Sequence, residues 1–141
     1  MRVKLEPGAI APTRAHTTDA GIDLYAFEDR TIKKKSKGYV RTGVHIELPH
    51  GTAGLIITKS GLAKWKGIFT TGLIDEGYSG EICVLVQNFG FEDFTFKKGD
   101  KVSQLVVIPV LYENIDVVDE INQGERGDNG FGSTGYKWYI L

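Results

Sequence analysis

The sequence is short of cysteine, histidine and long apolar runs. Its single cysteine, Cys83, excludes an intrachain disulfide and fits a reducing compartment. The three histidines and Cys83 have no metal-ligand spacing, so a zinc site is rejected. No stretch approaches the ~20 apolar residues that span a bilayer, and the opening sequence MRVKLEP lacks the apolar run of a signal peptide. We therefore expect a cytoplasmic protein that binds no membrane.

A strong net charge is missing as well. Seventeen basic residues against eighteen acidic ones leave a formal charge of −1, whereas proteins that follow a nucleic-acid backbone usually carry a basic face. The local cluster of Lys33, Lys34, Lys35 and Lys37 is interpreted as a solvated loop between two strands rather than a polyanion site. Stable nucleic-acid binding is therefore not expected.

Long helical periodicity is also absent, and short apolar segments take its place. Between residues 39 and 48, apolar side chains such as Val40 and Val44 alternate with polar ones, as in a half-buried strand. Two continuous apolar runs, 54–58 and 81–86, are interpreted as strands covered on both faces. The expected elements are strands at 39–48, 54–58, 81–86, 94–96 and 102–111 and one short helix at 61–66.

Many short strands separated by glycine-bearing turns indicate a β-sandwich or barrel rather than a doubly wound sheet. No linker or internal repeat is visible, so we expect one domain over residues 1–141. Residues 123–141 differ, because glycine recurs from Gly124 to Gly135 and an aromatic-apolar tail follows. Glycine-rich backbone is costly in entropy to fix. We therefore expect a mobile C-terminal arm that a ligand or a neighbouring subunit orders.

The arm contains a glycine pattern with more than one interpretation. Residues 130–135 read GFGSTG and match the dinucleotide fingerprint G-x-G-x-x-G, but only six residues follow, so no βαβ unit can form and this interpretation is rejected. Glycine amides, the hydroxyls of Ser133 and Thr134 and the guanidinium of Arg126 still suit phosphate. The ring of Phe131 could lie over a base. The alternative is a flexible tail without a ligand.

Three other segments carry polar residues suited to anion binding or catalysis. The strand-to-helix turn at Ser60 is either an anion site or an ordinary N-cap. The segment 72–80 is expected to be a hairpin with an acid, Asp75, and an aromatic, Tyr78, on its rim. Asp75 could take a proton from water, or it could serve the turn alone. Gln104 is polar among apolar residues and needs a partner in the core or on a ligand.

Two further acids, Asp19 and Asp23, lie four residues apart with Gly21 between them, so they do not share a helix face. Their carboxylates suit either metal coordination through water or turn formation. The sequence leaves both interpretations open.

Each of these motifs is weak alone, but their order is specific. The five segments are AGIDL (20–24), KSGLA (59–63), GLIDEGYSG (72–80), GDKVSQL (99–105) and RGDNGFGSTG (126–135). In this order they resemble the five motifs of the trimeric dUTP pyrophosphatase (dUTPase) family. With Asp19 included, the resemblance covers residues 19 to 135, which is nearly the whole chain.

The resemblance implies an all-β, jelly-roll-like barrel that forms a homotrimer, in which each active site is built from all three chains. It also implies hydrolysis of dUTP to dUMP and pyrophosphate with Mg²⁺ as cofactor, which lowers dUTP and supplies dUMP for thymidylate synthesis. Asp75 would activate the water that attacks the α-phosphorus, and Asp23 would contact the Mg²⁺ through water. Tyr78 would pack on the deoxyribose and exclude a 2′-hydroxyl.

The resemblance further assigns the substrate-binding residues. The uracil edge would pair with Gly72, Leu73, Ile74 and Cys83, and Phe131 would stack on the base. The phosphates would be bound by Lys59, Ser60, Gly61, Gln104, Arg126, Gly132, Ser133 and Thr134. Lys59 stands where the family usually has arginine, and a point charge in place of a bidentate fork is expected to weaken the phosphate contacts.

Three alternative functions stay open. A dCTP deaminase has the same fold, but the complete glycine arm and the hairpin argue against it. A binding protein would regulate a partner through nucleotide-dependent closure of the arm. Such a regulatory protein partner is expected if the chain is of phage origin, and the loop 29–37 is the candidate surface. A structural jelly-roll protein without activity would leave Asp75, Arg126 and Phe131 without a role.

Overall fold

The computed structural model describes residues 1–130, 133 and 135. No helix in this part of the chain is long and apolar enough to cross a membrane. The elements are β1 (Arg2–Leu5), β2 (Ile22–Tyr25), β3 (Arg30–Ile32), β4 (Ser36–Glu47), β5 (Thr52–Ile57), α1 (Ser60–Lys66), β6 (Ile68–Ile74), β7 (Glu81–Asn88), β8 (Phe94–Phe96) and β9 (Lys101–Pro109).

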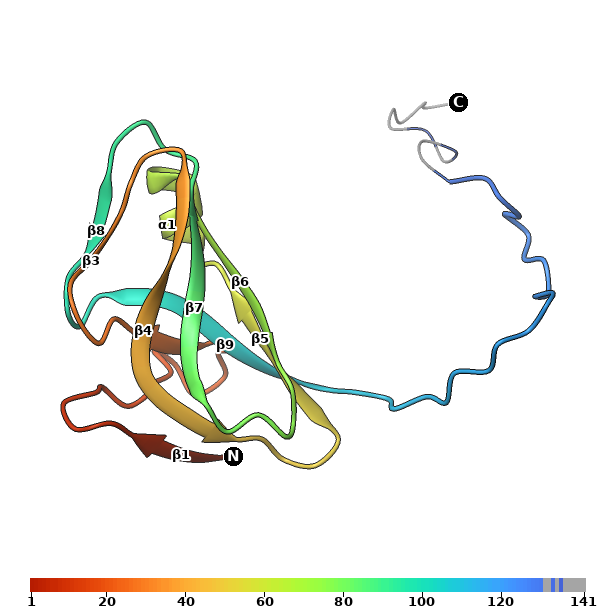
Figure 1. The fold of residues 1–141 in the computed structure, drawn as a ribbon, viewed down its shortest axis with the longest axis horizontal. Coiled ribbons are helices and arrows are strands. Elements are labelled where there is room, and N and C mark those ends of the chain that lie inside the picture. Colours follow the sequence, from red (N-terminus) through yellow and green to blue (C-terminus); the bar gives the residue numbers. More distant parts are fainter. Residues whose placement is uncertain (131–132, 134, 136–141) are drawn as a thin grey trace.

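Antiparallel pairing builds the barrel. Seven strands form one sheet in the order β1-β4-β7-β6-β5-β9-β2, and β3 pairs with β8 in a separate ribbon. The large sheet curls around its inner face, and the short helix α1 lies at one end (Figure 1). The expected all-β, jelly-roll-like architecture with one short helix is therefore confirmed. Strands β1, β2, β3 and β6 were not predicted from the sequence.

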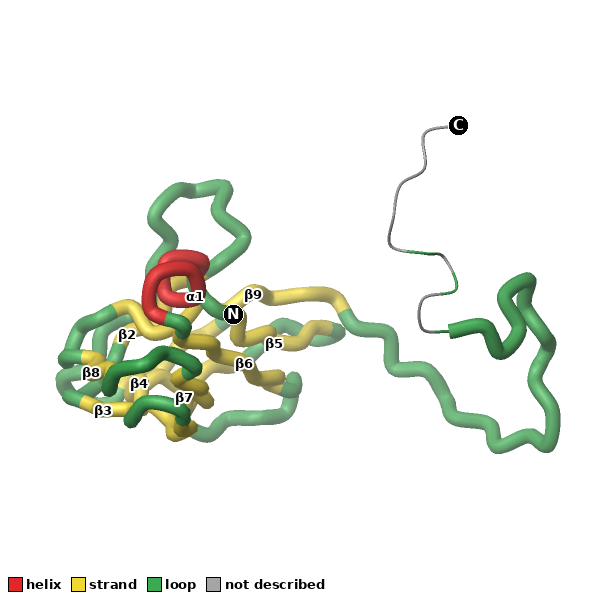
Figure 2. Tube along the Cα trace, turned by 90° about the horizontal axis from the view of Figure 1, so that it is seen from above, coloured by secondary structure: helices red, strands yellow, loops and turns green. Residues whose placement is uncertain are grey.

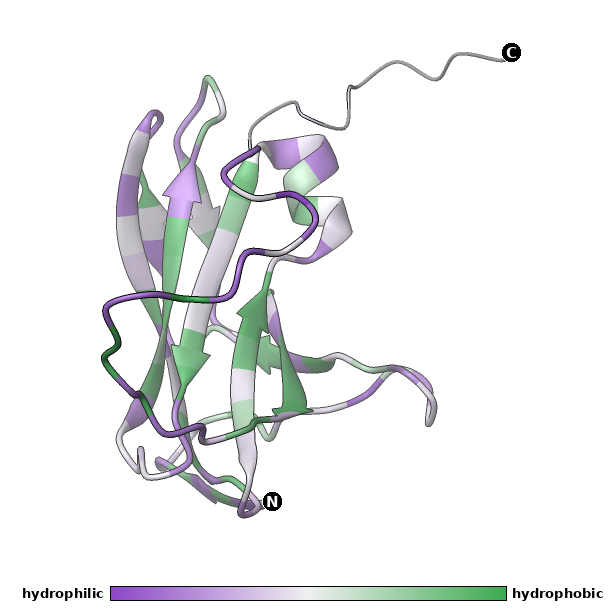
Figure 3. Cartoon of the chain, turned by 90° about the vertical axis from the view of Figure 1, so that its right-hand side faces the viewer, coloured by the Kyte–Doolittle hydropathy of each residue, from purple (hydrophilic) through white to green (hydrophobic). Residues whose placement is uncertain are grey.

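The long strand β4 shows how alternating side chains make the barrel wall. Val40 and Val44 are fully buried in the core, as the alternation predicted. Apolar stretches follow the strands, whereas the loops are mainly hydrophilic (Figure 3). The pairing of β4 with β7 shifts around Gly43, which has a φ of 66°. A Cβ there would lie 2.7 Å from Ala9 and 2.8 Å from Phe27, so this bulge requires glycine.

The two apolar runs interpreted as strands covered on both faces are covered on one face only, so that prediction was wrong. Alternate residues of β7 point into the core, whereas Cys83 and Leu85 are exposed, and Ile57 of β5 is exposed too. The sheet curls around one core, and within the described residues no second layer covers its outside. Leu85, Tyr39 and Phe69 therefore form an exposed apolar patch on the outer face.

The last strand is shorter than expected, and the chain leaves the barrel earlier than residue 123. β9 ends at Pro109 rather than Leu111, and residues 111–130 are exposed, without helix or strand. Beyond Tyr112, which still contacts the barrel, this segment extends away from it in two views (Figures 1 and 2). Ile115 and Val117 are 91% and 96% exposed.

Two buried hydroxyls in the core allow a matched test of packing. Thr42 Oγ1 donates to the carbonyl of Ile82 at 2.7 Å and accepts the N–H of Val44 at 3.2 Å. Ser103 Oγ, equally buried, has no hydrogen-bond partner within the described residues. An unpaired buried hydroxyl costs free energy, and a paired one is costly to remove.

We expect Ser103→Ala to leave the free energy of unfolding unchanged or to raise it by up to about 1 kcal/mol, and Thr42→Val to lower it by about 1–2 kcal/mol. Urea unfolding of both variants beside the wild type measures the difference. Equal losses in the two variants would contradict this account of the core.

Candidate active site

The site residues expected from the sequence fall into three clusters. The Asp23 cluster contains Asp23, Lys59, Ser60, Gly61 and Gln104. The hairpin cluster contains Gly72, Leu73, Ile74, Asp75, Tyr78 and Cys83. The arm cluster contains Arg126 and Ser133, and the remaining predicted residues Phe131, Gly132 and Thr134 lie outside the described residues.

The two acids of the N-terminal segment lie in different environments. Asp19 accepts the backbone N–H of His16 at 3.0 Å and serves an exposed turn. Asp23, on β2, is only 5% exposed, and its carboxylate accepts hydrogen bonds from the ammonium groups of Lys59 and Lys101, the latter at 2.7 Å. Turn formation therefore explains Asp19 but not Asp23.

The neighbouring lysines keep the Asp23 carboxylate ionised. Burial alone would raise its pKa, but the hydrogen bonds from Lys101 and Lys59 together outweigh burial and hold the pKa below its usual value. Lys101 is a site residue that the sequence reasoning missed. Its only sequence signal was its place in the same segment as Gln104, and the pairing of β2 with β9 brings it to Asp23.

A cavity of about 340 Å³ opens beside this ion-pair cluster and is lined by Lys59, Ser60, Gly61, Leu62, Lys101 and Gln104. Two ammonium groups, a hydroxyl and an amide around one cavity suit an anion with several oxygens. The N-cap of α1 is Lys59, and the helix has no side-chain cap there. The N-cap interpretation of Ser60 is therefore wrong, because the helix begins at Ser60 itself.

Gln104 depends on a glycine opposite it. Gln104 pairs with Asp23 across β2 and β9, and its Nε2 lies 3.4 Å from the carbonyl oxygen of Thr58. A Cβ at Gly21 would clash with the amide of Gln104. Any side chain at residue 21 therefore displaces Gln104 from the cavity.

The hairpin expected from the sequence joins β6 to β7 through residues 75–80. The N–H of Tyr78 donates to the carbonyl of Asp75 at 3.0 Å, and the Tyr78 hydroxyl donates to the carbonyl of Glu81 at 2.9 Å. A Cβ at Gly80 would clash with the Tyr78 ring, so this glycine lets the ring lie across the turn. Asp75 is exposed on the rim.

Glu81 holds the base of the hairpin and was not predicted. Its carboxylate accepts the N–H of Gly43 at 2.8 Å and the Nε of Arg41 at 2.9 Å, and Arg41 also donates to Glu6 at 2.8 Å. Burial alone would raise the pKa of Glu81, but the hydrogen bonds from Gly43 and Arg41 lower it below its usual range. Burial, with the charge of Glu81, raises the pKa of the Cys83 thiol, which is therefore protonated.

Glu76 holds the tip of the hairpin and was also missed. It accepts the Tyr112 hydroxyl at 2.6 Å, the Nδ1–H of His50 at 2.8 Å and the N–H of Gly51 at 2.9 Å. These hydrogen bonds, with that from Tyr112 the largest, lower the pKa of Glu76 to about 2. Its partners are at least 25 residues away in the sequence, so only the folded chain brings them together.

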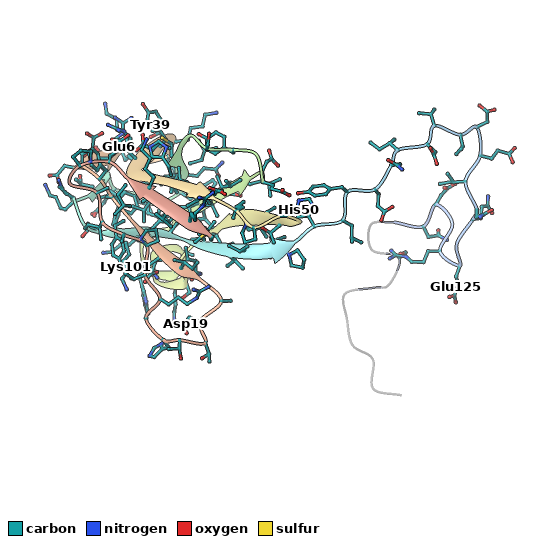
Figure 4. All side chains as sticks on the ribbon, turned by 90° about the horizontal axis from the view of Figure 1, so that it is seen from below. Glu6, Asp19, Tyr39, His50, Lys101 and Glu125 are labelled. Carbon is teal, nitrogen blue, oxygen red and sulfur yellow. The ribbon has the colours of Figure 1, made fainter. Side chains whose placement is uncertain are left out.

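Asp75, at the tip of the hairpin cluster, and Lys59, in the Asp23 cluster, lie toward different ends of the chain's β5 strand, although Gly72 and Gln104 approach each other across it. Ile74 faces Gly54 near the start of β5, whereas Lys59 follows the end of that strand. Five residues of extended chain span about 16 Å. Figure 4 shows His50 at the end from which the arm leaves and Lys101 toward the other end.

The hairpin cluster and the Asp23 cluster also lie beside different cavities. A cavity of about 700 Å³ lies beside Asp75 and shares no described lining residue with the cavity beside Asp23. One protomer therefore does not bring the exposed acid to the phosphate-type cavity.

The described part of the arm brings two predicted residues together. Arg126 donates to the hydroxyl of Ser133 at 3.1 Å, and the N–H of Asn129 donates to the carbonyl of Arg126 at 3.0 Å. Glu125, next to Arg126, lies far from the barrel (Figure 4). The arm thus presents a guanidinium and a hydroxyl side by side, but not to either cavity of its own barrel.

Curled antiparallel strands with one short helix and a detached glycine-rich arm place the chain among jelly-roll-like β-barrel proteins. Comparison with known proteins narrows this class, because the model of the dUTPase family matches residues 8–135. The chain belongs to the dUTPase family.

Named relatives agree with this assignment. The deoxyuridine 5′-triphosphate nucleotidohydrolase of Clostridium novyi (strain NT) is 43% identical over 135 residues, covering 94% of this chain and 95% of the relative. The corresponding protein of Clostridium kluyveri is 44% identical over 135 residues, with 94% of each chain covered.

Solved structures are similar over most of the chain. The dUTPase of Staphylococcus bacteriophage 80alpha with dUpNHpp superposes with a TM-score of 0.89 at 28% identity, covering 96% of this chain and 98% of that one. A mutant dUTPase from phage phi11 of S. aureus, described with a structural Mg(II) ion, has a TM-score of 0.79 at 26% identity, covering 84% and 96%. The resemblance seen in the sequence is therefore confirmed.

The contacts of Glu76 predict a pH dependence of stability. The carboxyl titrates near pH ~4.3 in an unfolded chain and at about 2 in the folded one. Because the folded pKa is the lower one, the stabilisation is complete above roughly pH 5 and is lost as the pH falls toward 2. We expect the difference in Tm between the wild type and Glu76→Gln to be largest above about pH 5 and to shrink below it. Thermal melts from pH 2 to 7 measure this, and a constant difference would contradict it.

Proposed function

We propose that the chain hydrolyses dUTP to dUMP and pyrophosphate, which lowers dUTP and supplies dUMP for thymidylate synthesis. The observation that carries the proposal is an exposed acid, Asp75, on a turn that hydrogen bonds hold in place, in a chain of the dUTPase family. The named relatives at 43% and 44% identity are nucleotidohydrolases of deoxyuridine triphosphate, which supports this substrate.

Asp75 acts as the general base in this proposal. Its carboxylate takes a proton from water, and the water oxygen bonds to the α-phosphorus while the bond to the bridging oxygen breaks and pyrophosphate leaves. Lys59 and Lys101 neutralise phosphate charge, and Ser60 and Gln104 hydrogen-bond the phosphate oxygens beside Gly61. Positioning and charge neutralisation are the main sources of catalysis in such reactions.

Recognition of the nucleoside belongs to the hairpin in this proposal. The backbone at Gly72, Leu73 and Ile74 and the nearby Cys83 pair with the uracil edge. Tyr78 packs on the deoxyribose and leaves no room for a 2′-hydroxyl. The support for this role is that Gly80 and the Glu81 carbonyl hold the Tyr78 ring in one place.

A homotrimer with shared active sites explains how the clusters would meet. In each site, the hairpin cluster of one chain would face the Asp23 cluster of a second, and the arm of the third would close over the nucleotide. Three observations support this assembly: the separate cavities, the exposed apolar patch on the outer face, and the exposed apolar arm. From the arm, Arg126, Gly132, Ser133 and Thr134 would bind the terminal phosphates, and Phe131 would stack on uracil.

The residues fit an Mg²⁺ ion carried by the triphosphate. No group of three or more His, Cys, Asp or Glu residues that could hold a metal occurs within the described part of the chain. Mg²⁺ usually keeps several waters and binds through one or two carboxylates and substrate phosphates. Asp23 is the carboxylate beside the phosphate-type cavity, and because each of its oxygens accepts from a lysine, it would contact the ion only through water. When bound, the ion would supply further charge neutralisation at the phosphates.

A regulatory protein partner stays a prediction. The dUTPase of phage 80alpha is described as controlling transfer of virulence genes by a G protein-like mechanism, and a similar role of this chain would need a partner surface. The segment 29–37 remains the candidate surface, although it is not a loop, because it contains β3 and the start of β4. Within this segment, Asp29 forms an ion pair with Lys97 at 2.8 Å, so the negative charge of Asp29 is already neutralised within the chain.

The decisive assay is pyrophosphate release by the purified protein with Mg²⁺ from dUTP, dTTP, dCTP and UTP. We expect release from dUTP alone, because thymine's methyl group and the 2′-hydroxyl of UTP are excluded. Release of ammonia from dCTP would instead support a deaminase. No release from any of the four by a folded protein would favour the binding function.

The role of Asp75 has its own test. Asp75→Asn should lower kcat by about 10²–10⁴-fold, because it removes the general base, while binding of dUpNHpp stays close to that of the wild type. The exposed Asp93, whose carboxylate accepts the N–H of Lys34, provides the matched control Asp93→Asn. Turnover in Asp75→Asn equal to that control would remove Asp75 from the role.

A further inference from the structure

One carboxylate joins the catalytic hairpin to the point where the arm leaves the barrel. Glu76, next to Asp75 in the chain, uses one oxygen to accept from His50 and the other to accept from Gly51 and Tyr112. His50 and Gly51 connect β4 to β5, and Tyr112 lies three residues beyond the end of β9. Two segments that are distant in the sequence therefore converge on this one side chain of the hairpin.

Gly51 forms hydrogen bonds both to the hairpin and to the segment that follows β9. Its N–H donates to Glu76 at 2.9 Å, and its carbonyl accepts the N–H of Val110 at 2.9 Å. Gly51 has a φ of 75°, which favours glycine at this turn. The segment that leads from β9 to the arm is thus held at Val110 through Gly51 and at Tyr112 through Glu76. Along the described arm, the next backbone hydrogen bond runs from Gly127 to Gly124.

The chemistry makes this anchor strong but reversible. A carboxylate that accepts three hydrogen bonds is a charge-assisted acceptor, and all of its donors come from outside its own turn. Tyr112 is 63% exposed, so the hydroxyl can leave Glu76 without unpacking the core. The direction of the arm at its base therefore depends on a contact that can form and break.

We propose that Glu76 is a positioning residue that sets the place of Asp75 and, through Tyr112, the direction in which the arm leaves the barrel. This inference rests on the proposed function. Asp75 and Glu76 are consecutive in a tight turn, so a change in the anchoring of Glu76 displaces the base beside it. A displacement of about 1 Å can cost a catalytic group roughly 10²-fold in rate. Placement of the base and closure of the arm are thereby coupled.

The test uses the full-length protein with Glu76→Ala, which removes every acceptor, Tyr112→Phe, which removes only the hydroxyl, and the double variant. The control is Glu47→Gln, which removes an exposed carboxylate that pairs with Arg2 at the last residue of β4 and makes no contact with Glu76. Glu76→Ala should lower kcat by about 10–100-fold, because Asp75 is misplaced. Tyr112→Phe should raise the KM for dUTP by roughly 3–10-fold with kcat nearly unchanged, as expected for loss of a hydrogen bond to a charged group at the arm base.

The double variant measures the coupling. If Tyr112 acts through Glu76, its removal should add nothing to KM in the Glu76→Ala background. The same fold-change of KM in both backgrounds would overturn the coupling. Should Glu76→Ala fail to fold, His50→Ala with Tyr112→Phe removes two of the donors and leaves Glu76 in place, and a kcat equal to that of Glu47→Gln would then overturn the positioning role.

A second readout separates positioning from mere stability. The amide of Gly51 donates directly to Glu76, so its hydrogen exchange should be at least about tenfold faster in Glu76→Ala and unchanged in Glu47→Gln. Faster exchange with wild-type kcat and KM would show a structural contact only and overturn the inference. Absence of pyrophosphate release by the wild type would remove the proposed function and the inference together, whereas an active wild type with a fully active Glu76→Ala would remove the inference alone.

Discussion

The inner strand β5 imposes the constraint on which the rest of the molecule depends. It pairs with β6 on one side and with β9 on the other, so both of its ends are held rigidly in the sheet. The hairpin that carries Asp75 emerges near one end, and Lys59 follows the other. A base and the phosphate that it serves must come within hydrogen-bond reach of one substrate. Because β5 keeps Asp75 and Lys59 apart, the proposed function places the reaction in an assembly of chains rather than in a single barrel.

Ion pairs and hydrogen bonds hold the carboxylates of the two proposed halves of the site in place before a substrate binds. Asp23 is neutralised by two lysines, Glu81 by Arg41 and backbone, and Glu76 by donors from two neighbouring segments. Within the described residues Asp75 forms no ion pair, so its carboxylate is available to accept a proton. Preorganised groups of this kind cost little rearrangement when the reaction occurs. The pairing therefore separates supporting carboxylates from the one proposed to react.

Several elements could be predicted from the sequence because a local pattern encodes them. The alternation around Val40 and Val44 predicted β4, and the Ser-Gly turn predicted α1 to within one residue at its start. The continuous apolar runs in β5 and β7 led to a wrong prediction. Such a run does not distinguish a strand covered on both faces from one whose outer face is exposed. The strand β6 was not predicted, because it contains threonines and a glycine, and the place of these residues in a sheet is decided by the neighbouring strands.

For the candidate site, the sequence by itself determined the residue types and the family: an acid and a tyrosine in one turn, a lysine and a glutamine in two other motifs, and a glycine-rich arm, in the order of one family. Only the tertiary structure decided the partners. Lys101 meets Asp23 through the register of β2 against β9, and Glu76 meets Tyr112 across 36 residues. Residue types follow from local sequence, but contacts between distant residues depend on strand register and on where the barrel closes. For this reason Asp75 could be picked out from the sequence, whereas Glu76, whose partners are distant in the chain, could not.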